Sequence, residues 1–344
     1  MAKPILVLKF GTASITTENG ELDETVIKDI AKQVAQLHNQ YHLVLVSSGA
    51  VAAGKRFIKN YSGTLSEKKA AASVGNPLLL NTYSQYFLPY GISIAQSLCE
   101  RHHFSNRSQF LQLQKTYQEL WASNIIPIAN ENDVVSNLEL KFSDNDELAT
   151  LIAVGFGASI LLFSTSVPGV LDKSGKVIDQ LDTTDKDVLL LANKEKSASG
   201  LGGMTSKLTF ARLANLMGIK VVIFGVKTPE GILNAINGKT GTLCLPQECN
   251  ISARKKWLAS GSLVTGRIQI DAGAHKALKN RHSLLAVGIK KILEGFDIGE
   301  VIEILDEKNN AIAVAKSKIA SSMLKDNLKV QNLEVAHADH IVLL

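Results

Sequence analysis

Two lysines that lie beside glycines are the residues of this sequence best suited to bind phosphate. Lys9 lies in LKFGTAS, between an apolar run and Gly11, and Lys207 ends SGLGGMTSK, residues 199–207. Glycine lets backbone amides approach an anion closely, and the start of a helix favours negative charge. Taken alone, the first motif is better explained by a solvated lysine at a strand exit. A flexible glycine linker, however, leaves Lys207 unexplained.

Two short segments rich in Asp and Asn lie between these lysines. NENDVV spans residues 130–135 and SDNDELAT spans residues 143–150. Asp and Asn also cap helices and build turns, which is the better explanation for any one of them. Two such segments within one short interval are harder to explain as caps alone. VSSGAVAAG, residues 46–54, adds a turn of small residues, for which close packing and ligand contact account equally well.

Apolar runs that alternate with amphipathic stretches predict the framework that positions these motifs. The runs are continuous, as in strands covered on both faces. They span 5–8, 42–46, 125–129, 159–163 and 220–224. Helical spacing predicts helices over 23–39, capped by Asp23, over 107–124, and over 206–217, followed by Gly218. Strands alternating with helices predict an α/β fold with a mostly parallel sheet.

This alternation stops near Pro246, where a polar and then basic segment follows. Beyond it we predict short strands and one clear short helix, 272–278; the strands span 263–270, 284–286, 300–305, 311–315 and 340–344. We therefore predict a catalytic domain over 1–247, a linker over 248–262 and a small, mainly β domain over 263–344. A chain of 344 residues exceeds the usual size of one hydrophobic core, which agrees with two domains.

Composition limits the class of protein. Hydrophobic residues make up 45% and charged residues 20%, which is typical of a globular and not of a disordered chain. No apolar run is long enough to span a bilayer, and the start MAKPILVLKFG lacks a signal-peptide pattern. We therefore expect a cytoplasmic protein without a processed leader and without a membrane partner.

Net charge and cysteine content limit the kinds of ligand that the protein is expected to bind. The net charge of +5 suits anionic ligands and does not by itself indicate nucleic acid. Cys244 and Cys249 lack a second pair or nearby histidines, so we predict neither a disulfide framework nor a metal site built from protein ligands.

Taken in order, the motifs resemble the amino acid kinase superfamily and, within it, the glutamate 5-kinases. LKFGT, VSSGAVAAG, ASVG, IPIANEND, SDNDELAT, GLGGMTSK and TGTL follow the order of the family. GRIQIDAGAHKAL, SLLAVGI, GEVIEI and EVAHADHIV resemble the PUA domain, a small β-barrel-like module. The resemblance implies a three-layer sandwich with a mostly parallel central sheet, then a mainly β PUA-like domain. It also implies ATP-dependent phosphorylation of the γ-carboxylate of L-glutamate, the first step of proline biosynthesis.

The resemblance also assigns roles to matching positions. It implies that Lys9 and Lys207 hold the transferring phosphoryl group, and that Asp146 orients both ammonium groups. The positions that match substrate-binding residues are Ser48, Asp133 and Asn145. Those that match nucleotide-binding residues are Lys9, Gly11, Thr165, Ser166, Leu201, Gly202, Gly203, Met204, Thr205, Ser206 and Lys207. The sequence departs from the family pattern at Ser143, at Ser166, in the GLGGM loop, and at Asn76, where glutamine is usual.

This reaction needs charge stabilisation more than it needs proton transfer. A glutamate side chain has an ordinary pKa of about 4.3 and is ionised at neutral pH, so no general base is required. Two lysines and Mg²⁺ would offset the repulsion between this carboxylate and the phosphates of ATP. We therefore expect ATP and Mg²⁺ as cofactors. The resemblance further implies a homo-oligomer, dimer or tetramer, that is inhibited by proline.

Two alternatives stay open from the sequence. One is a related kinase that acts on another carboxylate, carbamate or phosphate, although such lineages usually append a different regulatory domain. The other is an RNA-binding or regulatory protein built on a degraded kinase, acting through the PUA-like domain. The mild charge and the aromatic content of 6% argue against a strong nucleic-acid surface.

Overall fold

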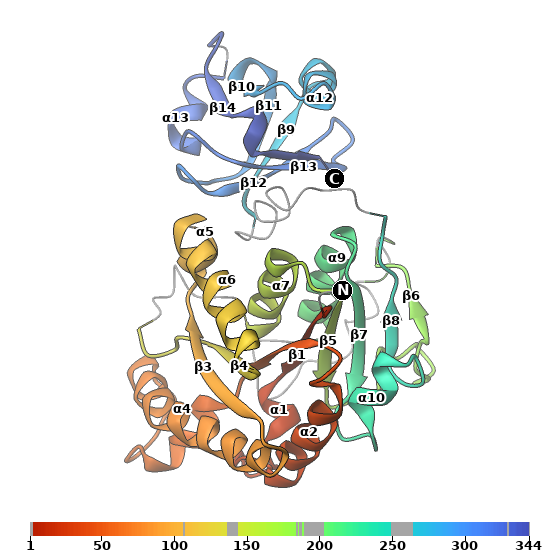
Figure 1. Ribbon diagram of the computed structural model, residues 1–344. Helices are drawn as coiled ribbons and strands as arrows, with labels where there is room; N and C mark the ends of the chain where they lie inside the picture. Colours follow the sequence, from red (N-terminus) through yellow and green to blue (C-terminus); the bar gives the residue numbers. More distant parts are fainter. Residues whose placement is uncertain are drawn as a thin grey trace. The chain divides into compact units, whose positions relative to one another are not determined.

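The computed structural model of the chain describes residues 3–105, 107–135, 144–183, 185, 188, 203–248, 264–328 and 330–343. The chain folds into two compact units, Met1–His103 with Ser108–Cys249, and Asn250–Leu344 with Phe104–Arg107 (Figure 1). Residues 249–263 lie outside the described part of the chain. The predicted domain boundaries at 247 and 263 therefore stay predictions.

A mostly parallel sheet forms the centre of the first unit (Figure 1). Within the described ranges it has eight strands in the order β3-β4-β2-β1-β5-β7-β8-β6. The central strand β1 pairs in parallel with β2 and β5, and among the described strands of this sheet only β7 and β8 pair antiparallel. The strands are β1 (Ile5–Phe10), β2 (His42–Ser47), β3 (Ser93–Cys99), β4 (Ile125–Glu131), β5 (Ile160–Thr165), β6 (Gln180–Leu181), β7 (Lys220–Gly225) and β8 (Thr242–Cys244).

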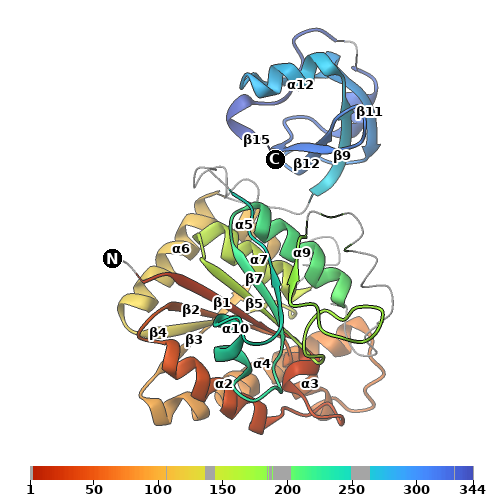
Figure 2. The ribbon, with the colours of Figure 1, turned by 90° about the vertical axis from the view of Figure 1, so that its right-hand side faces the viewer.

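Helices cover both faces of this sheet, so the unit is a three-layer sandwich. Figure 2 shows α6, α7 and α9 on one face and α2, α4 and α10 on the other. The described helices are α1 (Thr12–Ile15), α2 (Glu24–Leu37), α3 (Ala50–Gly54), α4 (Leu65–Phe87), α5 (Arg101–Ser105), α6 (Arg107–Ala122), α7 (Asn145–Phe156), α9 (Met204–Leu216) and α10 (Gly231–Ile236). The predicted fold class is therefore confirmed.

Local sequence explains why these elements form. The helix α2 starts at the predicted cap, where Asp23 Oδ1 accepts from the Val26 N–H at 3.2 Å. Its apolar stripe packs on the buried side chains of β1, including Leu6 and Leu8, in one continuous core. The helix α9 is followed by Gly218, whose φ of 76° ends the helical geometry as predicted.

The second unit is small and mainly β, as predicted. Its larger sheet has the order β11-β9-β12-β13-β15, and a second sheet pairs β10 with β14. The helix α13 (Ser321–Lys325) accompanies α12 (Ala272–Lys279), so the prediction of one helix was too low. The strands are β9 (Val264–Ile270), β10 (Leu284–Leu285), β11 (Ile289–Glu294), β12 (Val301–Leu305), β13 (Ala311–Lys316), β14 (Glu334–Ala336) and β15 (Ile341–Leu343).

Candidate active site

Three charged side chains from distant parts of the sequence meet inside the first unit. Lys9 Nζ lies 2.6 Å from Asp146 Oδ1, and Lys207 Nζ lies 3.0 Å from Asp146 Oδ2. The aspartate is fully buried, and Lys9 and Lys207 are 4% and 5% exposed. One carboxylate therefore holds two ammonium groups, and these three residues together carry one net positive charge when both lysines are protonated.

The ends of three elements position this cluster. Lys9 lies near the carboxyl end of β1, and Asp146 and Lys207 lie in the first turns of α7 and α9. Asp144 ties the two helix starts together. Its Oδ1 accepts from the N–H groups of Asp146 and Glu147, and its Oδ2 accepts from the Ser206 hydroxyl. Ligands of open parallel sheets bind at the carboxyl ends of the strands, where this cluster lies.

Burial and charge oppose each other in the pKa values of the cluster. Burial raises the pKa of Asp146, but the charges of Lys9 and Lys207 outweigh burial, so the net pKa is lowered. Burial and then the charge of Lys9 lower the pKa of Lys207, against the opposing effect of Asp146. An additional anion beside Lys207 would favour its charged form and so oppose the effects of burial and of Lys9 on its pKa. The cluster is thus suited to a phosphate group.

Two of the three predicted substrate-binding residues lie in contact beside this cluster. Asn145 Nδ2 donates to Ser48 Oγ at 2.8 Å, and Asn145 Oδ1 accepts from the Glu131 N–H at 3.2 Å. Ser48 follows β2, and Asn145 is the residue before Asp146. The third, Asp133, lies in the turn after β4. Its predicted role as a substrate ligand stays a prediction.

Two buried asparagines that the site prediction does not include extend this contact. Asn145 Nδ2 also donates to Asn130 Oδ1 at 2.9 Å, and Asn130 Nδ2 donates to Asn76 Oδ1 at 3.2 Å. Asn130 belongs to the Asp- and Asn-rich segment noted in the sequence, whereas Asn76 stood out only as a departure from the family pattern. Their contact joins β4 to α4, which no local motif reveals.

Close packing of two helices brings Asn76 to this place. A Cβ on Gly75 would lie 1.7 Å from the Ala50 carbonyl oxygen, and a Cβ on Gly54 would lie 1.9 Å from the Ala71 carbonyl oxygen. Both glycines are therefore required for α3 and α4 to approach each other. The small-residue motif VSSGAVAAG thus has a packing role in this structure.

The predicted nucleotide-binding residues lie at the ends of three elements. Gly11 directly follows β1, and its N–H lies 3.4 Å from Ser164 Oγ, one residue before Thr165 at the end of β5. Ser166 is exposed beyond that end. Gly203 precedes α9, which has no side-chain cap at its start, and Met204, Thr205, Ser206 and Lys207 form the first turn. Leu201 and Gly202, like Ser143, lie outside the described residues.

A protein-built metal site is not present in the described ranges. They contain no group of three or more His, Cys, Asp or Glu side chains arranged to hold a metal ion. The carboxylate of Asp146 binds the two lysines. The carboxylate of Asp144 accepts from the N–H groups of Asp146 and Glu147 and from the Ser206 hydroxyl. The described carboxylates therefore do not form a complete cage for Mg²⁺.

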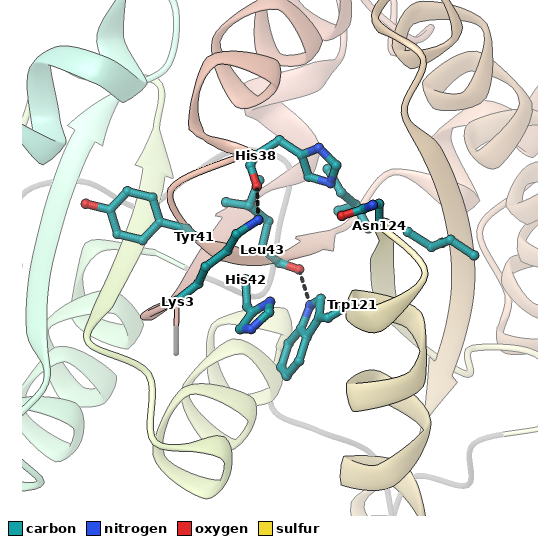
Figure 3. A pocket seen from close by; sticks show the side chains of 9 residues that line it. Lys3, His38, Tyr41, His42, Leu43, Trp121 and Asn124 are labelled. Carbon is teal, nitrogen blue, oxygen red and sulfur yellow. Dashed lines mark hydrogen bonds between the residues drawn. The ribbon is translucent and has the colours of Figure 1, made fainter. Parts of the chain in front are cut away.

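A separate hollow lies at the opposite ends of the strands (Figure 3). His42 begins β2 there, stacking on Trp121 with ring centroids 5.0 Å apart, and Lys3 Nζ donates to the His38 carbonyl at 3.3 Å. Burial and then the charge of Lys3 lower the pKa of both His38 and His42. Because Lys9 lies at the other end of β1, this hollow is not part of the candidate active site.

The fold and the cluster define the class of protein. A three-layer α/β sandwich that buries two lysines on one aspartate at its strand ends has the positive charge and the geometry to hold a phosphoryl group. The sequence model of the amino acid kinase family matches residues 4–225, and that of the PUA domain matches residues 266–337. The chain belongs to the amino acid kinase family.

Relatives and solved structures agree with this membership. The chain is 34% identical to "Glutamate 5-kinase" of Thermoanaerobacter sp. (strain X514), over 98% of this chain and 97% of the relative. It is 38% identical to "Glutamate 5-kinase" of Kosmotoga olearia, over 88% and 85% of the two chains. Carbamate kinase from Giardia lamblia bound to AMP-PNP has the same fold, with a TM-score of 0.52 at 16% identity, over 72% of this chain and 99% of that chain.

Among the helices of the described ranges, none combines the length and the apolar character needed to cross a bilayer.

Proposed function

We propose that this chain transfers the γ-phosphoryl group of ATP to the γ-carboxylate of L-glutamate, giving L-glutamyl 5-phosphate and ADP. This would be the first step of proline biosynthesis. The observation that carries the proposal is that Asn145 contacts Ser48 while the next residue, Asp146, contacts both lysines. A substrate bound at Ser48 and Asn145 would place its reacting carboxylate beside the lysine pair. The relatives named glutamate 5-kinase, which match nearly the whole chain, support the choice of substrate.

The chemistry requires no catalytic base. The γ-carboxylate of glutamate is ionised at neutral pH, since its ordinary pKa is about 4.3. One of its oxygens attacks the γ-phosphorus, and the bond to the bridging oxygen of ADP breaks as the new phosphorus–oxygen bond forms. No proton moves in this step. The barrier comes from repulsion between anions and from charge that spreads over the transferring phosphoryl oxygens.

Lys9 and Lys207 would lower this barrier because their ammonium groups are held in fixed positions. Asp146 holds each ammonium group by a separate oxygen, which fixes both before the nucleotide arrives. Donors fixed in advance stabilise developing charge without the cost of reorganisation during the reaction. The buried net positive charge of the cluster would be offset by the phosphate.

ATP would bind with its phosphates at the start of α9. Within the described residues no side chain caps the first turn of this helix, which leaves N–H groups there to bind an anion. Mg²⁺ characteristically enters nucleotide sites with few protein ligands and several phosphate oxygens, which fits the lack of a three-ligand group in the described ranges. When bound, Mg²⁺ supplies additional positive charge to the phosphates.

A coupled assay of ADP release tests the substrate. L-glutamate, L-aspartate, N-acetyl-L-glutamate and UMP are offered in turn with ATP and Mg²⁺. We expect turnover with L-glutamate at least ten times that with any of the others. Turnover with one of the others and none with L-glutamate would reject the proposal.

Three further proposals rest on the family resemblance. Proline inhibits the reaction, the chain forms a homo-oligomer, and, with weak support from its sequence, the PUA-like unit binds RNA. Inhibition assays with proline, sedimentation analysis and titration with labelled RNA test these separately. We place the enzyme in the cytoplasm, where ATP is regenerated, which cell fractionation would check.

A further inference from the structure

Three hydrogen bonds that link Glu131, Asn145, Asn130 and Asn76 have directions that are fixed by one backbone amide. The Glu131 N–H can only donate, so the side-chain atom of Asn145 that faces it at 3.2 Å must be the oxygen. The Nδ2 of Asn145 then donates to Asn130 Oδ1 at 2.9 Å. This leaves the Nδ2 of Asn130 to donate to Asn76 Oδ1 at 3.2 Å. Turning any one of these amides over would oppose two donors or two acceptors.

The chain of amides ends at a donor without a hydrogen-bond partner among the described residues. Asn76 is 6% exposed, and its Nδ2 has no hydrogen-bond partner within the described part of the chain. The direction set by Glu131 excludes the turned-over amide, which would present an oxygen there. Buried polar groups are nearly always hydrogen-bonded in native proteins, so an unpaired donor in the interior calls for an explanation.

The other end of the same network also presents a donor. Ser48 Oγ accepts from Asn145 Nδ2, so its hydroxyl proton is left to donate elsewhere. Both N–H groups of Asn145 Nδ2 are used, by Ser48 and by Asn130. The network therefore offers protons to a ligand at Ser48 and at Asn76, and Asn145 acts by holding both. A ligand that pairs with donors only is an anion or a carbonyl oxygen.

We propose that Asn76 is a substrate-binding residue whose Nδ2 donates to the α-carboxylate of the amino acid. This inference rests on the proposed function, because the γ-carboxylate of L-glutamate is assigned to the lysine pair and the α-carboxylate is the remaining anionic group. Asn130 is the positioning residue, because its Nδ2 donates to Asn76 Oδ1 and so keeps the Nδ2 of Asn76 as the atom left to donate. The close contact between α3 and α4 at Gly54 and Gly75 holds Asn76 where it can bond to Asn130.

Steady-state kinetics of Asn76→Ala and Asn76→Asp test this assignment with L-glutamate and isoglutamine, whose α-carboxylate is replaced by a carboxamide. The Asp variant keeps an oxygen that can accept from Asn130, which preserves the fold if the Ala variant does not fold. It also turns the free donor into a negative acceptor. Asn81→Ala, on an exposed position of the same helix, is the matched control.

We expect KM for L-glutamate to rise about 10- to 100-fold in the Ala variant, with KM for ATP within twofold of wild type, since a hydrogen bond to a charged group is lost. The ratio of kcat/KM for L-glutamate to that for isoglutamine should fall at least tenfold in the Asp variant. The new carboxylate repels the α-carboxylate of L-glutamate but not the neutral carboxamide of isoglutamine. Asn81→Ala should change neither. KM for L-glutamate within twofold of wild type in both Asn76 variants would overturn the inference. If wild type itself does not use L-glutamate, the proposed function fails, and the inference fails with it.

Discussion

Asn145 and Asp146 are consecutive residues of α7 whose side chains serve different partners. Asn145 contacts Ser48 and Asn130, and Asp146 contacts the two lysines. Successive residues of a helix point about 100° apart, so one helical turn can face two neighbouring sites at once. The start of α7 therefore sets the distance between the proposed acceptor substrate and the phosphoryl group, which is the geometry that transfer requires.

Replacing either lysine should slow catalysis more than it weakens substrate binding. Lys9→Ala and Lys207→Ala are each expected to lower kcat by about 100- to 1000-fold, which is the usual effect of removing one fixed donor to a transition state. KM for L-glutamate should change by much less, because the charge matters most during transfer. Initial rates of ADP release measure both. A kcat near that of wild type in both variants would refute this role.

Removing the carboxylate of Asp146 should destabilise the fold. Asp146→Ala leaves two buried ammonium groups without their shared partner, and breaking a buried pair costs about 3–5 kcal/mol. Urea unfolding measures the change in the free energy of unfolding. Glu21→Ala is the control, since it breaks an ion pair with Arg56 whose side chains are 60% and 62% exposed and should have little effect. Equal stability of the two variants would contradict the stabilising role of the contacts between Asp146 and the two lysines.

Nucleotide binding should take up protons at alkaline pH. The pKa of Lys207 is lowered from its ordinary 10.5, so part of this group is neutral in the alkaline range below that value. A phosphate beside it favours the charged form, so binding raises its pKa and draws a proton from the buffer. Calorimetry of ATP binding in two buffers with different ionisation enthalpies should give different apparent enthalpies. The control variant Lys227→Met, which changes an exposed lysine, should show the same difference between buffers as wild type. Equal apparent enthalpies of ATP binding in the two buffers for wild type would contradict the prediction.

A methyl group at Gly75 should disrupt the packing of α4. Its Cβ would lie 1.7 Å from a backbone oxygen of α3, so Gly75→Ala should lower the free energy of unfolding by about 3 kcal/mol, the upper end for overpacking. Because this contact also places Asn76, KM for L-glutamate should rise in any variant protein that folds. Ser73→Ala, exposed on the same helix, is the control and should change neither quantity. Wild-type stability of Gly75→Ala would show that the close approach is not required.

Much of the fold could be predicted because it depends on local patterns. Each of the five apolar runs in the first unit is a strand, since a strand covered on both faces leaves a continuous apolar signal. The edge strand β3 is only partly buried and mixes polar with apolar residues, so it lacks that signal. The helix α4 contains Gly75 and Pro77, which favour a break when read alone. Tertiary packing against α3 outweighs both.

The candidate site could be predicted only in part. The motifs around Lys9, Asp146 and Lys207 are visible in the sequence, and family resemblance supplies the link among them. The free donor of Asn76 depends on the direction of a hydrogen bond from the Glu131 backbone, and Asn130 and Asn145 lie between the two residues in the network. No spacing or composition encodes such a direction, so it required the structure.

The most direct test of the central claim follows the oxygen that is phosphorylated. L-glutamate labelled with ¹⁸O in its γ-carboxylate is incubated with ATP, Mg²⁺ and the enzyme, and the acyl phosphate is trapped with hydroxylamine. Attack of hydroxylamine on the acyl carbon releases phosphate that keeps the bridging oxygen. We predict one ¹⁸O atom in each phosphate released and γ-glutamyl hydroxamate in equal amount. Unlabelled phosphate, or ADP formed without hydroxamate, would contradict transfer to the γ-carboxylate.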